Sequence, residues 1–205
     1  LIYYSSEVKQ YGCDAVAAVA VCLAADEWLR REKTWITTTL LAATGATALW
    51  FSHPVLFVLA AVGAALLLNQ ACRRRWKGLA LGCGACALWA VSFGAAYWAS
   101  VARLSRHEAL IAYWSPYFWP CASAWSTQIA WLRHASERLI GKTMGFQPLW
   151  PAALALALGC ASLWRRDRLT LWCLLGPAVL ALAASALKKY PFEGRLLLFA
   201  VPGLL

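Results

Sequence analysis

A run of 39 residues without a formal charge is the feature that most restricts how this chain can fold. Residues 34–72 contain no Asp, Glu, Lys or Arg, and His53 is their one basic side chain. An apolar helix of about 20 residues crosses the hydrocarbon core of a bilayer, so the run is long enough for two helices. Because Pro54 disfavours helix at the residue before it, residues 52–54 are the predicted break between them.

The rest of the chain repeats this pattern of apolar runs that end in basic clusters. Hydrophobic residues make up 62% of the 205 residues and charged residues only 14%, against about 25% in a typical soluble protein. The composition therefore favours an all-α, polytopic transmembrane helix bundle, which we expect to form a single domain (residues 1–205). We expect six full spans, at about 8–29, 35–51, 54–70, 78–102, 148–164 and 169–187, and a truncated seventh span from Leu196.

The basic residues indicate which side of the membrane each loop faces. If the spans alternate, the clusters at 30–33, 73–77 and 165–168 share one side, and they hold ten Lys or Arg residues. The positive-inside rule makes that side cytoplasmic. The net charge of +10 is thus explained by membrane topology, and we expect no nucleic-acid partner. The segments that then face outward are the N-terminal segment, 52–54, 103–147 and 188–195.

The outer segment (residues 103–147) contains a helix that we expect to lie in the membrane surface. Residues 126–139 have helical period, with charged residues away from the apolar face, which is typical of an interfacial helix. Trp125, Ile129, Leu132 and Leu139 take the apolar face. The aromatic turn before it (residues 113–120) has two interpretations, an interfacial anchor and a platform for a sugar ring or polyprenyl chain.

The first fourteen residues, LIYYSSEVKQYGCD, place charges directly before an apolar run. In a helix, Glu7, Tyr11 and Asp14 lie at i, i+4 and i+7 and share one face, whereas Lys9 points elsewhere. Two carboxylates and a phenol at the mouth of a transmembrane helix are costly unless they face protein or water. The residues alone leave open a solvated helix start and a functional face.

The segment IYYSSEVKQY resembles the Y-S-x-E-x-R/K-x-Y signature of bacterial membrane glycosyltransferases related to family 39. These GT-C enzymes are similar to dolichyl-phosphate-mannose protein mannosyltransferases. Tyr4, Ser5, Glu7, Lys9 and Tyr11 match the signature, and Lys9 stands where many relatives have Arg.

The resemblance implies a multi-pass enzyme of the bacterial inner membrane. Such an enzyme transfers a sugar from a polyprenyl-phosphate donor to an acceptor at the extracytoplasmic face. The family's catalytic acid lies in a loop upstream of this motif, so we expect the chain to be part of a longer protein and assign no catalytic base within it. The partners implied are the polyprenyl-linked sugar donor and membrane lipid.

The C-terminal loop (residues 188–195) and the run after it, YPFEGRLLLFAVP, resemble a late stretch of the same family in which an Arg opens an outward-facing span. The resemblance implies that Tyr190 and Arg195 lie at the donor phosphate. A guanidinium binds phosphate through two hydrogen bonds and stabilises it as a leaving group. Contact with anionic headgroups is the other interpretation of Arg195 and the one we favour for Lys188 and Lys189.

His53 lies in the outer turn at residues 52–54, where the family often has a His after an aromatic residue. It is either part of the donor site or a hydrogen-bonded turn residue. No His, Cys or carboxylate cluster in the sequence has metal-ligand spacing, and Cys83 and Cys86 stand in an uncharged apolar run. We therefore expect neither a metal nor a cofactor.

Two other classes of protein stay open. A lipid or polysaccharide transporter would need charges or broken helices in mid-membrane, and the predicted spans after the first have almost none. A non-catalytic membrane scaffold is the other alternative. A pair of acidic residues in the loop after an upstream first span would favour the enzyme over both.

The charge pattern predicts that position 75 is cytoplasmic and position 115 extracytoplasmic. In cysteine-free full-length protein, Ser115→Cys should react with an impermeant maleimide in intact cells, and Arg75→Cys should react only after lysis. Labelling at 75 but not at 115 in intact cells would reverse the topology.

Overall fold

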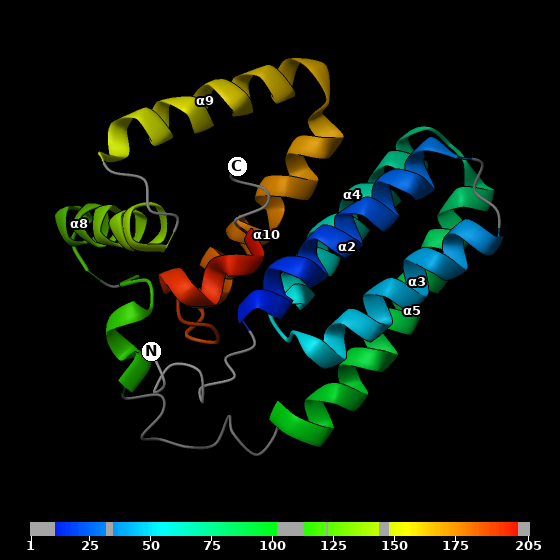
Figure 1. The fold of residues 1–205 in the computed structure, drawn as a ribbon, viewed down its shortest axis with the longest axis horizontal. Coiled ribbons are helices and arrows are strands. Elements are labelled where there is room, and N and C mark those ends of the chain that lie inside the picture. The colour runs from blue at the N-terminus through cyan, green and yellow to red at the C-terminus, as the bar shows by residue number, and fades with distance from the viewer. Residues whose placement is uncertain (1–10, 32–34, 102–112, 122, 144–147, 201–205) are drawn as a thin grey trace.

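All the elements in the described part of the chain are helical, which confirms the all-α class (Figure 1). The computed structural model describes residues 11–31, 35–101, 113–121, 123–143 and 148–200. The α-helices are α2 (Tyr11–Arg30), α3 (Trp35–Phe51), α4 (Val55–Cys72), α5 (Trp76–Ala96), α8 (Trp125–Ser136), α9 (Leu149–Arg166) and α10 (Arg168–Ala186). The other elements are the π-helices η1 (Tyr97–Val101) and η3 (Glu137–Thr143) and the 3₁₀ helices η2 (Ser115–Tyr117) and η4 (Gly194–Ala200).

Three helices are long and apolar enough to cross a membrane: Val55–Cys72, Trp76–Ala99 and Arg168–Ala186. They coincide with the predicted spans at 54–70, 78–102 and 169–187. The predicted spans α2, α3 and α9 are not in this set. Helix α3 has 17 residues, which gives a rise of about 26 Å. Helices α2 and α9 carry basic residues in their last turns. Large apolar side chains such as Val16, Leu68 and Val91 are at least 65% exposed, as expected of helices that lipid surrounds.

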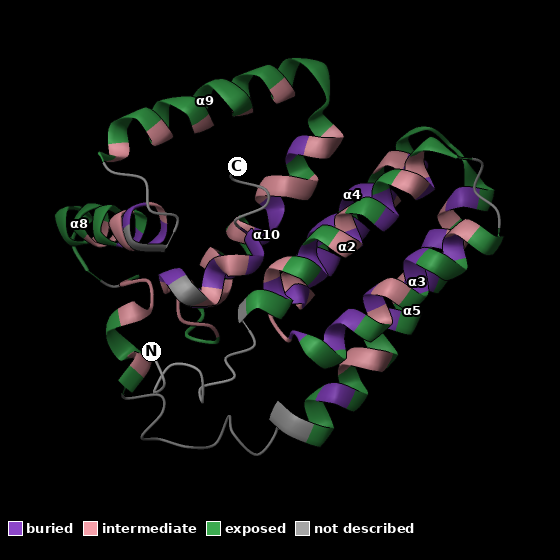
Figure 2. Cartoon of the chain, in the orientation of Figure 1, coloured by how far each residue is buried: buried purple, intermediate pink, exposed green. Residues whose placement is uncertain are grey.

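Helices α2, α3, α4 and α5 lie side by side, and their facing surfaces form the core (Figures 1 and 2). Helix α4 is central, because it packs against α2, α5 and α10. Ala61, Val62 and Gly63 are buried in succession, so neighbouring helices cover α4 on more than one face. On α2, the buried Trp28 donates from Nε1 to Thr38 Oγ1 of α3 at 3.0 Å.

Helix α9 stands apart from these four helices and contacts mainly α10 and η3 (Figure 1). It has no buried residue, and Figure 2 shows it almost entirely in the colours of exposed and intermediate residues. The helix predicted at 126–139 is present as α8, which continues without a break into η3. Its position in the membrane surface stays a prediction.

The segment near Leu196, where we expected a seventh span to begin, forms the short 3₁₀ helix η4. Leu197, Phe199 and Ala200 are all buried, and η4 packs against α2, η3 and α10. The segment therefore covers the end of the bundle with its apolar side chains, and residues 201–205 lie outside the described part.

Helices α3 and α5 approach each other closely where Gly45 faces Trp89. The Trp89 indole donates from Nε1 to the Ala42 carbonyl at 3.1 Å. A Cβ on Gly45 would lie 2.6 Å from Trp89 Cε2 and 2.7 Å from Leu59 Cδ2. The indole thus fills the space that the missing side chain leaves, a packing mode common between helices in lipid.

We predict that Gly45→Ala lowers the thermal stability of the protein in detergent. The clash should cost about 1–3 kcal/mol, more than the gain of up to about 1 kcal/mol in helix propensity. Gly84→Ala is the matched control, because a Cβ there meets nothing within 4 Å. Equal melting temperatures for the two variants would contradict the Gly45–Trp89 contact.

Candidate functional site

The start of α2, the turn at 52–54 and the C-terminal loop meet at one end of the bundle, where α2 and α4 begin and α3 ends. We call this end the outer end, after the predicted topology. In Figure 1 the start of α2 lies beside η4, and the two elements pack together. The Phe57 ring of α4 contacts the Tyr190 ring edge-on at 4.9 Å between centroids and stacks on Phe199 at 5.6 Å. The N-terminal helix, the turn at 52–54 and the C-terminal loop are therefore neighbours.

Asp14 places a buried carboxyl group at the outer end. It lies in the first turn of α2 with only 5% exposure, and its carboxyl group faces the Ser52 hydroxyl and the His53 ring across the helix junction. Ser52 is 1% exposed, and its Oγ makes no well-aligned hydrogen bond within the described residues. A buried hydroxyl and a buried carboxyl side by side form a polar site that can take up a further hydrogen-bonding group.

Tyr190 also lies at the outer end, and its hydroxyl group contacts the backbone of η4. Its hydroxyl donates to the Leu196 carbonyl at 2.7 Å, and its ring is partly buried against the core. Arg195 is the second residue of η4 and is described by its backbone alone. The structure thus brings together Asp14, His53, Tyr190 and the chain at Arg195.

The remaining predicted residues belong to the N-terminal motif. Glu7 and Lys9 lie outside the described residues, and Tyr11 is the first residue of α2. The predicted face shared by Glu7, Tyr11 and Asp14 therefore stays a prediction.

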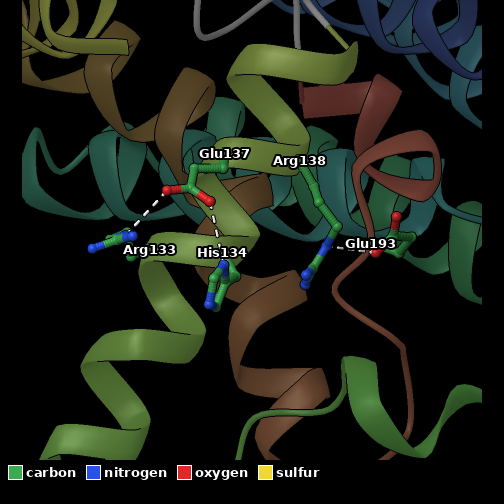
Figure 3. A network of polar contacts seen from close by, with 5 residues as sticks. All are labelled: Arg133, His134, Glu137, Arg138 and Glu193. Atoms are coloured by element: carbon green, nitrogen blue, oxygen red, sulfur yellow. Dashed lines mark hydrogen bonds and ion pairs between the residues drawn. The ribbon is translucent and has the colours of Figure 1, made fainter.

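The structure adds an ion pair that sequence reasoning missed. Arg138 of η3 places its Nε 2.9 Å from Oε2 of Glu193 in the C-terminal loop, with the alignment of an ion pair rather than of a hydrogen bond (Figure 3). The Arg138 guanidinium also lies over the Tyr117 ring, 5.3 Å from its centroid. The available signal was Glu193 itself, an acidic residue in an otherwise basic and aromatic loop.

A second, exposed network lies beside this pair (Figure 3). Glu137 accepts from Arg133 Nε at 3.1 Å and contacts His134 Nδ1 at 3.2 Å. Loss of hydration acts to raise the pKa of Glu137, but the hydrogen bonds from His134 and Arg133 outweigh it and hold the pKa below its ordinary value. These three residues lie at the junction where α8 continues into η3.

The aromatic turn packs against protein at the end of α10. The Tyr117 carbonyl accepts from the Phe192 amide at 3.0 Å, and the Trp119 amide donates to Ser185 Oγ at 3.0 Å. The Trp131 ring contacts the Trp119 ring at 5.3 Å and the Phe192 ring at 5.8 Å. The turn therefore joins the outer segment to the C-terminal loop, which neither of its two sequence interpretations included.

An apolar groove of about 700 Å³ runs between α2 and α3 next to the outer end. It is lined by Gly12, Cys13, Val16, Ala17, Ala20, Ala43, Thr44, Thr47, Ala48 and Phe51. Gly12 and Cys13 directly precede Asp14 in the chain, and Phe51 directly precedes Ser52. The groove therefore begins beside the polar site and runs along α2 and α3.

Within the described residues, no group of three or more His, Cys, Asp or Glu side chains is placed to hold a metal ion. No family model, curated protein or solved structure matches the chain. What is shown is a helical protein in which three helices are long and apolar enough to cross a membrane, with buried polar side chains at one end of its bundle.

We predict that Tyr190→Phe loosens η4 without unfolding the bundle. Loss of one hydrogen bond of about 1 kcal/mol should make amide exchange in residues 194–200 about five times faster. Hydrogen–deuterium exchange by mass spectrometry measures this, with Tyr113→Phe as the control because Tyr113 is 67% exposed. Unchanged exchange in Tyr190→Phe would show that its hydroxyl does not hold η4.

Proposed function

We propose that this chain is the membrane part of a bacterial glycosyltransferase of the GT-C superfamily, related to family 39. It transfers a sugar from a polyprenyl-phosphate donor to an acceptor at the extracytoplasmic face of the inner membrane. The observation that carries the proposal is the contact of Phe57 with Tyr190 and Phe199, together with the packing of α2 on η4. These contacts bring the start of α2, the helix that follows the N-terminal motif, beside the C-terminal segment that resembles the family, although the two lie at opposite ends of the sequence.

The proposed topology has six full spans, with α2, α3 and α9 added to the three helices that are long and apolar enough to cross a membrane. The basic ends of α2 and α9 suit the cytoplasmic surface, because Arg30 and Arg166 stand in their last turns. Lipid would cover the exposed apolar side chains of α9, such as Leu154 and Leu158.

In the proposed mechanism the donor phosphate binds at the outer end between positive groups from both motifs. Arg195 holds two phosphate oxygens and stabilises the charge that develops as the sugar leaves. Lys9 adds positive charge, and Glu7 orients one of the two cations. The catalytic base belongs to a loop upstream of the motif, so none of these residues takes the acceptor proton.

Two further observations support a lipid-linked donor at this place. The groove between α2 and α3 has an apolar lining suited to an isoprenoid chain. The buried Asp14 carboxyl and the partly buried His53 stand at its polar end. Ionisable groups at such a position in a membrane protein are most often functional.

We predict that Arg195→Ala and Glu7→Gln each slow transfer. Loss of one charged hydrogen bond, worth about 1.5–3 kcal/mol, corresponds to about a 10- to 150-fold lower turnover. Arg195→Lys should also lose activity, because an ammonium group cannot form the paired contact. Lys188→Ala and Lys189→Ala are the matched controls and should stay close to wild type, since both side chains are exposed.

The assay is transfer of labelled sugar from purified polyprenyl-phosphate donors by full-length protein in liposomes. Wild-type turnover in both Arg195→Ala and Glu7→Gln would reject the site. No transfer from any such donor, together with an upstream loop without acidic residues, would reject the enzyme and favour a transporter or scaffold.

A further inference from the structure

The ion pair between Arg138 and Glu193 differs from the others in the described chain. The side chains are only 24% and 23% exposed, and they come from two elements far apart in sequence. The other ion pairs between described residues join side chains three or four positions apart in one helix. Such local pairs on an exposed surface contribute little to stability.

A partly buried ion pair is also a poor source of stability, because the loss of hydration offsets much of the attraction. A substitution lowers stability strongly only when it removes one partner and leaves the other charge unpaired. A well-attested role of such pairs is to select one arrangement of the elements they join. Here the partners join η3 to the C-terminal loop, whose position no regular helix determines.

The residues around the pair connect it to the aromatic turn and to the start of η4. The Tyr117 ring covers the Arg138 guanidinium, and the Tyr117 carbonyl accepts from the Phe192 amide, one residue before Glu193. The Glu193 carbonyl in turn accepts from the Leu196 amide at 2.9 Å and so begins η4. A displacement of Glu193 therefore moves the chain that carries Arg195.

We propose that Arg138 and Glu193 are positioning residues that hold the C-terminal loop where it binds the donor phosphate. They act through Arg195 and touch no substrate themselves. The inference rests on the proposed function for the donor and on the structure alone for the link between the outer segment and the loop. The two parts are tested separately.

The link is tested by the distance between spin labels at Ser136→Cys and Lys189→Cys in cysteine-free full-length protein, both at exposed positions. A narrow distance distribution is expected with the native pair. Arg138→Gln and Glu193→Gln should each broaden it, and the double charge exchange Arg138→Glu with Glu193→Arg should narrow it again. Arg133→Gln is the matched control, because its pair with Glu137 is local and 75% exposed on the Arg side.

The role in donor binding is tested by kinetics on the same variants in liposomes. The donor KM should rise about tenfold in Arg138→Gln and in Glu193→Gln, equivalent to about 1.4 kcal/mol, with a smaller change in kcat. The charge exchange should recover most of the loss. A merely structural role would lower the amount of folded enzyme and leave KM unchanged.

Each outcome decides one part. Unchanged distances in both single variants would overturn the link. Broadened distances with an unchanged donor KM would overturn the role in donor binding. If the wild-type protein transfers no sugar from any polyprenyl-phosphate donor, the proposed function and the donor role fail together, and the distances still decide the link.

Discussion

Close contact between helices at small side chains is the interaction on which the rest of this structure depends. Helices surrounded by lipid gain little from the hydrophobic effect and associate through tight packing instead. Gly176 of α10 sits against Ala61 of α4, where an added Cβ would lie 2.7 Å from the alanine Cβ, and Gly63 admits Cys86 and Trp89 of α5. These contacts hold α5 and α10 on α4, and the C-terminal end of α10 then delivers the C-terminal loop to Phe57 at the outer end.

Buried polar side chains lie at both ends of the bundle, with Thr38 and Gln70 at the end opposite to Asp14 and Ser52. Asp14 and Ser52 are buried at the junction of the helices, and Arg138 of η3 is partly buried with Glu193, the residue before η4. Each of these groups loses hydration, which costs free energy unless a partner or a ligand compensates.

Much of the fold was predictable from local pattern, because hydropathy and helical period are properties of neighbouring residues. The limits of α3, α4 and α10 lie within two residues of the predicted spans at 35–51, 54–70 and 169–187. The turn at His53 follows from Pro54. In contrast, η4 forms where an α-helical span was expected, because burial of Phe199 against the bundle outweighs the local preference of an apolar run.

The sequence by itself determined the helical class and the presence of helices long and apolar enough to cross a membrane. The length of a run without charges can be read from consecutive residues, and so can the spacing of a motif. Neither depends on contacts with distant residues. Only the tertiary structure decided that Asp14, His53 and Tyr190 share one end of the bundle and that Arg138 meets Glu193. Such contacts depend on how α4 and α10 pack, and a pairing across two elements leaves no periodic signal in either of them.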